Sequence, residues 1–240
     1  PLLEPMSRLT GAVFARKAMS LLMEAKGVLG GSYLPNWPAA KAMVIGAGNI
    51  GCSAINVLAR NNFDLIVVDK HPETLRLRLS RYLPAEVKPK IKVIHFNENS
   101  PLQSVKALRQ QLSFCDIIVS AAVRRPTLPK DKCEYLICRQ DLKNMQKKSV
   151  ICDATACDKD FIESCISSES LTDYYFEQDI LHYNCDHIPA LVPSTATKLL
   201  TEATFPYTLM LADGSEDVLR DNPALSGAVM CRRGFCTHNI

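Results

Sequence analysis

Gly46, Gly48 and Gly51 are spaced as G-x-G-x-x-G between a short apolar run and a helix-like segment of this 240-residue chain. In that context the first glycine permits a tight turn, the second lets the backbone approach a pyrophosphate, and the third allows close packing of helix on strand. The helix would begin at Asn49 and Ile50, where free backbone N–H groups and the positive end of the helix dipole bind phosphate. These five residues predict a phosphate-binding loop for a dinucleotide.

Asp69 extends this predicted site, because it ends the next apolar run, 18 residues after Gly51. A carboxylate at this place accepts hydrogen bonds from the adenosine ribose and repels a 2′-phosphate. The cofactor that we predict is therefore NAD. The basic neighbours Lys70 and His71 leave room for NADP. The weaker alternatives are FAD and a glycine turn that binds no ligand.

Small residues follow the fourth apolar run, at Ala121, Ala122 and Val123. Ligands of a doubly wound sheet lie outside the carboxyl ends of the strands, near the point where the strand order reverses. Side chains of this size would let the ribose of a cofactor approach. The next two residues, Arg124 and Arg125, could bind a substrate carboxylate through paired hydrogen bonds, or they could belong to an ordinary solvated loop.

The elements that must position these residues alternate along the chain. Apolar runs typical of buried strands occupy residues 42–45, 65–68, 91–96, 116–120, 149–153 and, more weakly, 181–184. Helix-like segments occupy residues 49–61, 72–82, 100–112, 139–146 and 158–167. Strands separated by helices pair in parallel. The predicted fold class is α/β: a doubly wound parallel sheet of the Rossmann type, with flanking helices from a partial second domain.

Two long helix candidates, at 9–26 and 194–212, stand outside that alternation. We therefore expect three parts in the chain. Residues 1–34 would be a connecting helix from a second domain, residues 35–192 the dinucleotide-binding Rossmann domain, and residues 193–240 a return helix with a remnant of the substrate domain.

The composition narrows the class of protein. Hydrophobic residues make up 47% and charged residues 22% of the chain, which excludes a disordered or collagen-like protein, and the net charge of +3 does not predict a nucleic-acid partner. No apolar run is long enough to span a membrane, and the first residues lack the layout of a signal peptide. The ten cysteines include no C-x-x-C pair. We therefore expect reduced thiols in a cytoplasmic protein, with neither a metal site nor a disulfide framework.

Four segments are similar to motifs of a known family: EPMSRLTG at 4–11, DHIPALVPSTAT at 186–197, FPY at 205–207 and DNPALSG at 221–227. Together they resemble the alanine dehydrogenase and nicotinamide nucleotide transhydrogenase family, to which the lysine-forming saccharopine dehydrogenases are related. The similarity runs in the family's order over nearly the whole chain.

The resemblance implies an NAD-dependent amino-acid dehydrogenase, which moves a hydride between the nicotinamide and the Cα atom of an amino or imino acid. It also implies that Met6, Ser7, Asp186 and His187 lie around the cofactor. An imidazole titrates near neutral pH, so His187 is also a candidate for carrying the proton.

The segment after the fifth strand departs from the family pattern. Anchored on Asp153, it places Cys157 where the family has an aspartate that faces the nicotinamide region, and Asp158 stands one position later. The glycine pair that follows in the family is absent, and Ser194 replaces a family arginine. The catalytic candidates are Asp158, which stands one position after the family aspartate, and His187.

Members of this family are longer at the amino terminus, and their substrate-side lysine and histidine lie in that part. We therefore expect catalysis to need residues upstream of this chain, an amino acid or keto acid as the small-molecule partner, and a homo-oligomer. Two alternatives stay open. One is a saccharopine- or opine-type dehydrogenase that acts on a secondary amine, which residues 186–189 favour. The other is a non-catalytic module that binds NAD.

Overall fold

The computed structural model describes residues 3–31, 37–155, 159–212 and 216–237. Within these residues lies a seven-stranded sheet in the order β3-β2-β1-β4-β5-β7-β6. The terminal strand β6 pairs antiparallel with β7, and the other pairings are parallel. The strands are β1 (Lys41–Ile45), β2 (Asp64–Asp69), β3 (Ile91–His95), β4 (Ile117–Ser120), β5 (Val150–Asp153), β6 (Tyr175–Glu177) and β7 (Ile180–Tyr183).

The central strands are apolar between their ends because both faces of the sheet are covered. In β1, Ala42 and Val44 face one hydrophobic core, while Met43 and Ile45 face a second core on the opposite side. This alternation of side chains along a strand follows from the pleat. The sheet therefore separates two cores, as a doubly wound fold requires.

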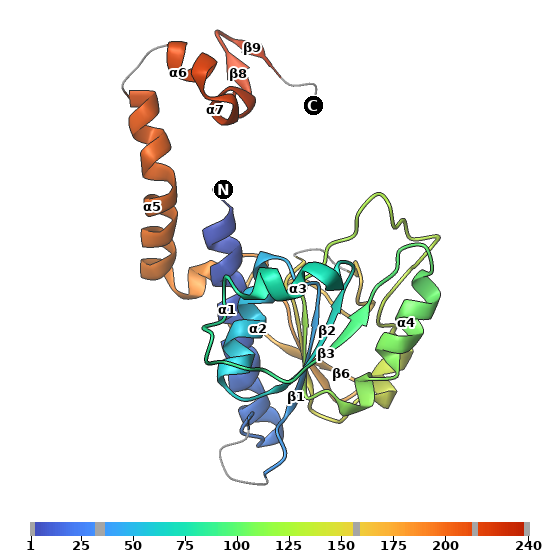
Figure 1. Ribbon diagram of the computed structural model, residues 1–240. Helices are drawn as coiled ribbons and strands as arrows, with labels where there is room; N and C mark the ends of the chain where they lie inside the picture. The colour runs from blue at the N-terminus through green and yellow to red at the C-terminus, as the bar shows by residue number, and fades with distance from the viewer. Residues whose placement is uncertain (1–2, 32–36, 156–158, 213–215, 238–240) are drawn as a thin grey trace.

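Helices cover the two faces in two groups (Figure 1). The helices α1 (Glu4–Lys26), α2 (Asn49–Arg60) and α3 (Pro72–Leu79) supply apolar side chains to the first core. The helix α4 (Pro101–Arg109) and the 3₁₀ helices η1 (Leu112–Phe114) and η2 (Arg139–Asn144) supply the second. The prediction of a doubly wound α/β sheet is confirmed. The three-part domain division stays a prediction.

One predicted helix is wrong. In the described part of the segment 158–167, the chain forms turns and an isolated parallel bridge between Ile162 and Ile137. The backbone N–H groups of Leu136 and Ile137 donate to the carbonyl of Phe161, and the N–H of Glu163 donates to the carbonyl of Ile137. Because these backbone groups pair with a distant segment, they are not available for a helical ladder.

The carboxyl-terminal part begins with η3 (Ile188–Leu191) and α5 (Pro193–Ala212), which starts beside α1 and runs away from the sheet (Figure 1). No residue of α5 is buried. Among the described residues, no helix combines the length and apolar character that crossing a membrane requires. The elements that follow are α6 (Glu216–Asp221), α7 (Pro223–Gly227), β8 (Cys231–Arg232) and β9 (Phe235–Cys236).

Candidate functional site

A cleft opens at the carboxyl ends of β1, β2 and β4, with a volume of about 260 Å³. The strand order reverses between β1 and β4, and ligands of doubly wound sheets bind at that point. The predicted site residues that line the cleft are Gly46, Gly48, Asp69, Lys70, Ala121, Ala122 and Val123.

The glycine loop, residues 46–51, leads from β1 into the first turn of α2 and is closely packed. Gly46 has φ +85°, a left-handed conformation that glycine adopts without strain, and its N–H donates to the carbonyl of Val68 at 2.7 Å. A Cβ atom on Gly51 would lie 1.9 Å from the carbonyl oxygen of Gly46, so α2 meets the turn backbone to backbone. A Cβ atom on Gly48 would meet nothing within 4 Å. An anion can therefore approach the backbone at Gly48, where α2 begins.

Asp69 stands at the end of β2 and is only 7% exposed. Its Oδ2 accepts a hydrogen bond from the N–H of Ala47 at 2.7 Å, and its Oδ1 accepts one from the N–H of His71 at 2.8 Å. Burial opposes ionisation, but these bonds and the guanidinium of Arg78 hold the pKa of Asp69 below its ordinary value. Asp69 is therefore a carboxylate at neutral pH, and it ties the glycine loop to the chain after β2.

The loop after β4 contributes further residues to the lining of the cleft. The N–H of Ala121 donates to the carbonyl of Ile45 at 2.8 Å, which extends the pairing of β4 with β1. Arg124 forms an ion pair with Asp160, with Nε and Oδ1 2.9 Å apart, and donates to several carbonyl groups around it. Arg124 therefore holds the loop structure, and of these two arginines it is the exposed Arg125 that lines the cleft.

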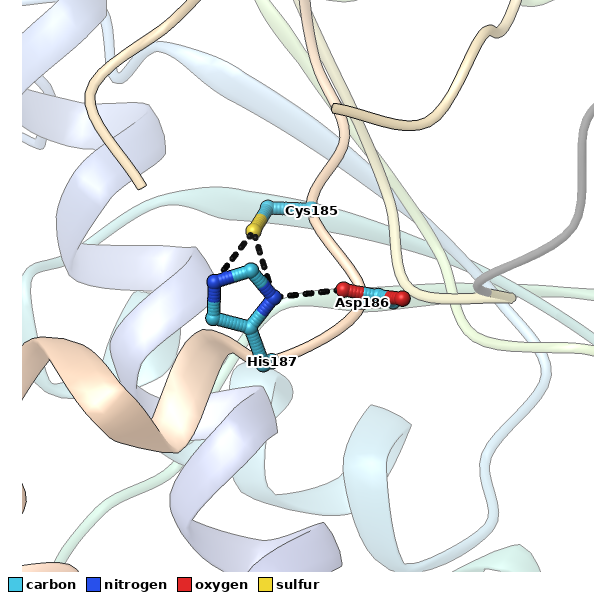
Figure 2. A group of neighbouring side chains, drawn as sticks. All are labelled: Cys185, Asp186 and His187. Carbon is cyan, nitrogen blue, oxygen red and sulfur yellow. Dashed lines mark hydrogen bonds and ion pairs between the residues drawn. The ribbon is translucent and has the colours of Figure 1, made fainter. Parts of the chain in front are cut away.

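Cys185, Asp186 and His187 follow β7, at the same edge of the sheet as the glycine loop (Figure 2). His187 Nδ1 lies 2.5 Å from Asp186 Oδ1, and Cys185 Sγ lies 3.6 and 3.9 Å from the two ring nitrogens. Cys185 is buried, whereas the other two side chains are exposed. Asp186 thereby orients the imidazole of His187, which can exchange a proton with a molecule at this edge of the sheet.

The same three side chains offer thiol, carboxylate and imidazole donors, whose candidate ligand atoms all lie within 4.8 Å of one another. A structural zinc site uses four ligands, and this group provides three from consecutive residues. The geometry therefore supports an imidazole held by a carboxylate better than a complete metal centre.

A model of the family described as "Alanine dehydrogenase/PNT, C-terminal domain" matches residues 11–239. The chain belongs to this family. The resemblance drawn from the sequence motifs is confirmed. "Alanine dehydrogenase 2" of Staphylococcus aureus (strain USA300) is 27% identical over 247 residues, which covers 99% of this chain and 61% of the relative. The chain thus spans about 61% of the length of that relative.

Solved structures of alanine dehydrogenase and transhydrogenase have the same fold as this family member. An "L-ALANINE DEHYDROGENASE" superposes with a TM-score of 0.79 at 21% identity, covering 99% of this chain and 62% of the other. The transhydrogenase from Sinorhizobium meliloti superposes with a TM-score of 0.76 at 17% identity, covering 98% of this chain and 63% of the other.

Several predicted site residues are not in the lining of the cleft. Met6 and Ser7 are on the first turn of α1, which the hydroxyl of Ser53 ties to α2 by donating to the carbonyl of Arg8 at 2.6 Å. Asn49 accepts a hydrogen bond from the hydroxyl of Tyr82 at 2.8 Å. The remaining predictions outside the lining are Ile50, Gly51, Asp186 and His187. Cys157 and Asp158 lie outside the described residues.

Arg78 lines the cleft, and sequence reasoning missed it. It comes from α3, and its Nη2 lies 2.7 Å from Oδ1 of Asp69. The available signal was its place in the helix, between Leu75 and Leu79, the two buried residues of α3. A charged residue on the buried face of a helix needs a partner, and the carboxylate at the end of the preceding strand is the one that it finds.

Proposed function

We propose that the cleft binds a nicotinamide dinucleotide, with NAD as the cofactor expected from Asp69, and that the whole protein is an amino-acid dehydrogenase of the alanine type. The observation that carries the proposal is the open approach to the backbone at Gly48, where α2 begins, beside a buried carboxylate at the end of β2. Phosphates bind at such a helix terminus, and the carboxylate binds the adenosine ribose. The family supports the activity.

The residues of this chain would bind and orient the reactants. Bound NAD supplies a hydride acceptor. In the oxidative direction the amino acid loses a hydride from Cα and a proton from nitrogen, and water then replaces the imine nitrogen to give a keto acid and ammonia. His187, held by Asp186 at 2.5 Å, would accept the released proton. Asp158 stays the second catalytic candidate proposed from the sequence.

Two other functions rest on narrower observations. The sequence DHIP at 186–189 favours a saccharopine- or opine-type substrate, whose secondary amine would lose the hydride and proton in the same way. The other is a module that binds the dinucleotide without catalysis, which is favoured by Cys157 at the position of the family aspartate and by the absence of the family's glycine pair. Turnover assays of the whole protein with primary and secondary amino acids separate the three.

The first experiment is a calorimetric titration of this chain with NADH, repeated on the Asp69→Ala variant. We expect the wild-type chain to bind and the variant to lose at least about tenfold in affinity for NADH, since charge-assisted hydrogen bonds to the ribose are worth roughly 1.5–3 kcal/mol. The matched control is Asp64→Ala, which removes a carboxylate at the other end of β2 and should bind as the wild type does. A wild-type chain that does not bind NADH contradicts the proposal.

A further inference from the structure

Asp69 has no hydrogen-bonding capacity to spare for a ribose. Its Oδ1 accepts from the N–H of His71 at 2.8 Å and from Nη2 of Arg78 at 2.7 Å. Its Oδ2 accepts from the N–H of Ala47 at 2.7 Å and, more distantly, from Nη1 of Arg78 at 3.4 Å. A carboxylate offers about four acceptor sites, so a ribose hydroxyl can reach Asp69 only by displacing one of these donors.

Arg78 is the donor that can move. The two N–H donors come from the backbone, whereas Arg78 reaches the carboxylate through a flexible side chain that is 27% exposed at the cleft. Its other donors go to the carbonyls of Ala47 and His71 and to the hydroxyl of Thr74. If NAD(H) displaced the guanidinium, Asp69 would gain the ribose while Arg78 would lose its charged partner.

A 2′-phosphate on the ribose removes that loss. Its oxygens would give the displaced guanidinium a new anionic partner, in the paired geometry that arginine forms with phosphate. The lining also favours an anion, because three cationic side chains, Lys70, Arg78 and Arg125, face two carboxylates, Asp69 and Glu98. Lys70 adds a second cation, whose Nζ lies 3.8 Å from Oε1 of Glu98 and whose side chain is half-exposed.

We propose that Arg78 is the specificity-determining residue of the cleft and that it allows NADP(H) to bind as well as NAD(H). The proposal rests on the proposed function, because it concerns the adenosine end of the same dinucleotide site. It departs from the expectation from Asp69 alone, in which the carboxylate rejects the 2′-phosphate. Here the negative charge of Asp69 is already neutralised by a cation that the phosphate can share.

The test is a pair of titrations, with NADH and with NADPH, on the wild-type chain and on Arg78→Gln. We expect the wild-type dissociation constants for the two cofactors to agree within about tenfold. In Arg78→Gln, affinity for NADPH should fall at least about tenfold, while affinity for NADH stays the same or rises. Arg78→Lys keeps the charge but not the paired geometry. Its affinity for NADPH should lie between those of the wild type and Arg78→Gln.

Arg76→Gln is the matched control, because it removes an exposed arginine of the same helix that does not line the cleft. It should leave both affinities unchanged. A wild-type chain that binds NADH more than about a hundredfold better than NADPH overturns the proposal. An unchanged ratio in a folded Arg78→Gln variant does the same while leaving the proposed function intact. Failure of the wild-type chain to bind either cofactor counts against the proposed function itself.

A second inference comes from the β8–β9 hairpin, which lies near the carboxyl terminus (Figure 1). Cys231 and Cys236 stand directly opposite each other in its register. The adjacent pair is hydrogen-bonded, since the N–H of Thr237 donates to the carbonyl of Met230 at 3.0 Å. Because bonded and non-bonded pairs alternate in antiparallel strands, the two cysteines form a non-hydrogen-bonded pair, whose Cα atoms lie about 4.5 Å apart.

That separation falls in the range of Cα distances that a disulfide bridges, about 4.4–6.8 Å. Both side chains are exposed, whereas the other described cysteines are buried or half-buried. We infer that Cys231 and Cys236 form a reversible disulfide with glutathione disulfide or a similar small disulfide as oxidant. One thiolate attacks the oxidant and releases a glutathione thiol; the other thiolate then displaces the second glutathione. Two protons leave the cysteines, and their two electrons reduce the oxidant.

Trypsin offers a direct test, since it cleaves after Arg232 and Arg233 and so separates the two cysteines. After treatment with glutathione disulfide and alkylation of remaining thiols, we expect the two hairpin peptides to be joined in the mass spectrum until a reductant is added. The Cys231→Ser control should instead carry glutathione on Cys236. A wild-type chain with stable glutathione adducts on both cysteines, or with two alkylated thiols, contradicts the inference.

Discussion

A Cβ atom added to Gly51 would lie 1.9 Å from the carbonyl oxygen of Gly46 and 2.9 Å from its carbonyl carbon. Both approaches are closer than Cβ atoms make in real structures, and the obstacle is backbone rather than a side chain that can turn away. The first turn of α2 therefore rests directly on the turn that leaves β1. This contact sets the direction in which the free N–H groups of α2 point.

Gly51→Ala should therefore destabilise the domain by roughly 3 kcal/mol or more, because either α2 or the turn must shift inside a packed core. Urea unfolding measures the change. Asn56→Ala, on the half-buried side of the same helix, serves as the control and should cost less than about 1 kcal/mol. Equal effects of the two substitutions would show that the backbone contact is not a constraint.

Gly48→Ala should have the opposite profile. Gly48 has φ −74° and open space where a Cβ atom would lie, so the free energy of unfolding should change by less than about 1 kcal/mol. The added methyl group would project into the space where the pyrophosphate approaches. We expect a folded variant whose affinity for NADH, measured by calorimetry, falls at least about tenfold. Retained NADH affinity would remove Gly48 from the phosphate loop.

The sequence predicted the features of this site that depend on local backbone geometry. The G-x-G-x-x-G spacing and Asp69 could be found because a strand, a tight turn and a helix follow each other within one short segment. Arg78 could not be found in the same way. Its role arises from the packing of α3, which places its guanidinium on a carboxylate nine positions earlier in the chain.

The wrong helix at 158–167 has a similar cause. Its apolar residues fit a helical pattern, but the backbone around Phe161 and Ile162 pairs with residues 136 and 137 instead. Such pairing between segments far apart in the chain overrides local propensity. The same region supplies Asp160, the carboxylate that forms an ion pair with Arg124. Local sequence patterns could not predict this ion pair either, because its two residues lie far apart in the chain.

Asp153 should make stability depend on pH. It is fully buried at the end of β5, and burial raises its pKa to about 6, an effect that the hydrogen bond from the backbone N–H of Thr155 offsets only in part. Because the folded protein holds this proton more tightly than the unfolded chain, stability falls as the pH rises from about 4 to about 6 and is then level. The ionised group therefore costs roughly 2–3 kcal/mol at neutral pH.

Asp153→Asn should remove that cost, because the amide cannot ionise. Its oxygen can still accept from the N–H of Thr155, which lies 3.1 Å from Oδ1 of Asp153 in the wild type. We expect the variant to be about 2 kcal/mol more stable than the wild type at neutral pH and nearly equal to it near pH 4. Urea unfolding at the two pH values measures the difference. A change of the same size at both values would mean that ionisation of Asp153 is not the cause.

His182 should add a dependence of the opposite sign. The ring is fully buried on β7, with Nε2 2.8 Å from the hydroxyl of Ser164 and Nδ1 3.0 Å from the carbonyl of Ile180. Burial lowers its pKa to about 4, against the hydrogen bond to Ile180. The neutral ring donates from Nδ1 to that carbonyl and accepts from Ser164 at Nε2, so protonation would place an uncompensated charge in the core.

Stability should therefore be lost as the pH falls from about 6.5 towards about 4, where the unfolded chain takes up a proton that the folded protein refuses. His182→Gln removes this titration, so the slope of its free energy of unfolding against pH should be lower than that of the wild type across that interval, by up to one proton. The exposed His95 provides the control, and His95→Gln should keep the wild-type slope. An unchanged slope in His182→Gln would show that the buried imidazole stays able to take up its proton in the folded protein.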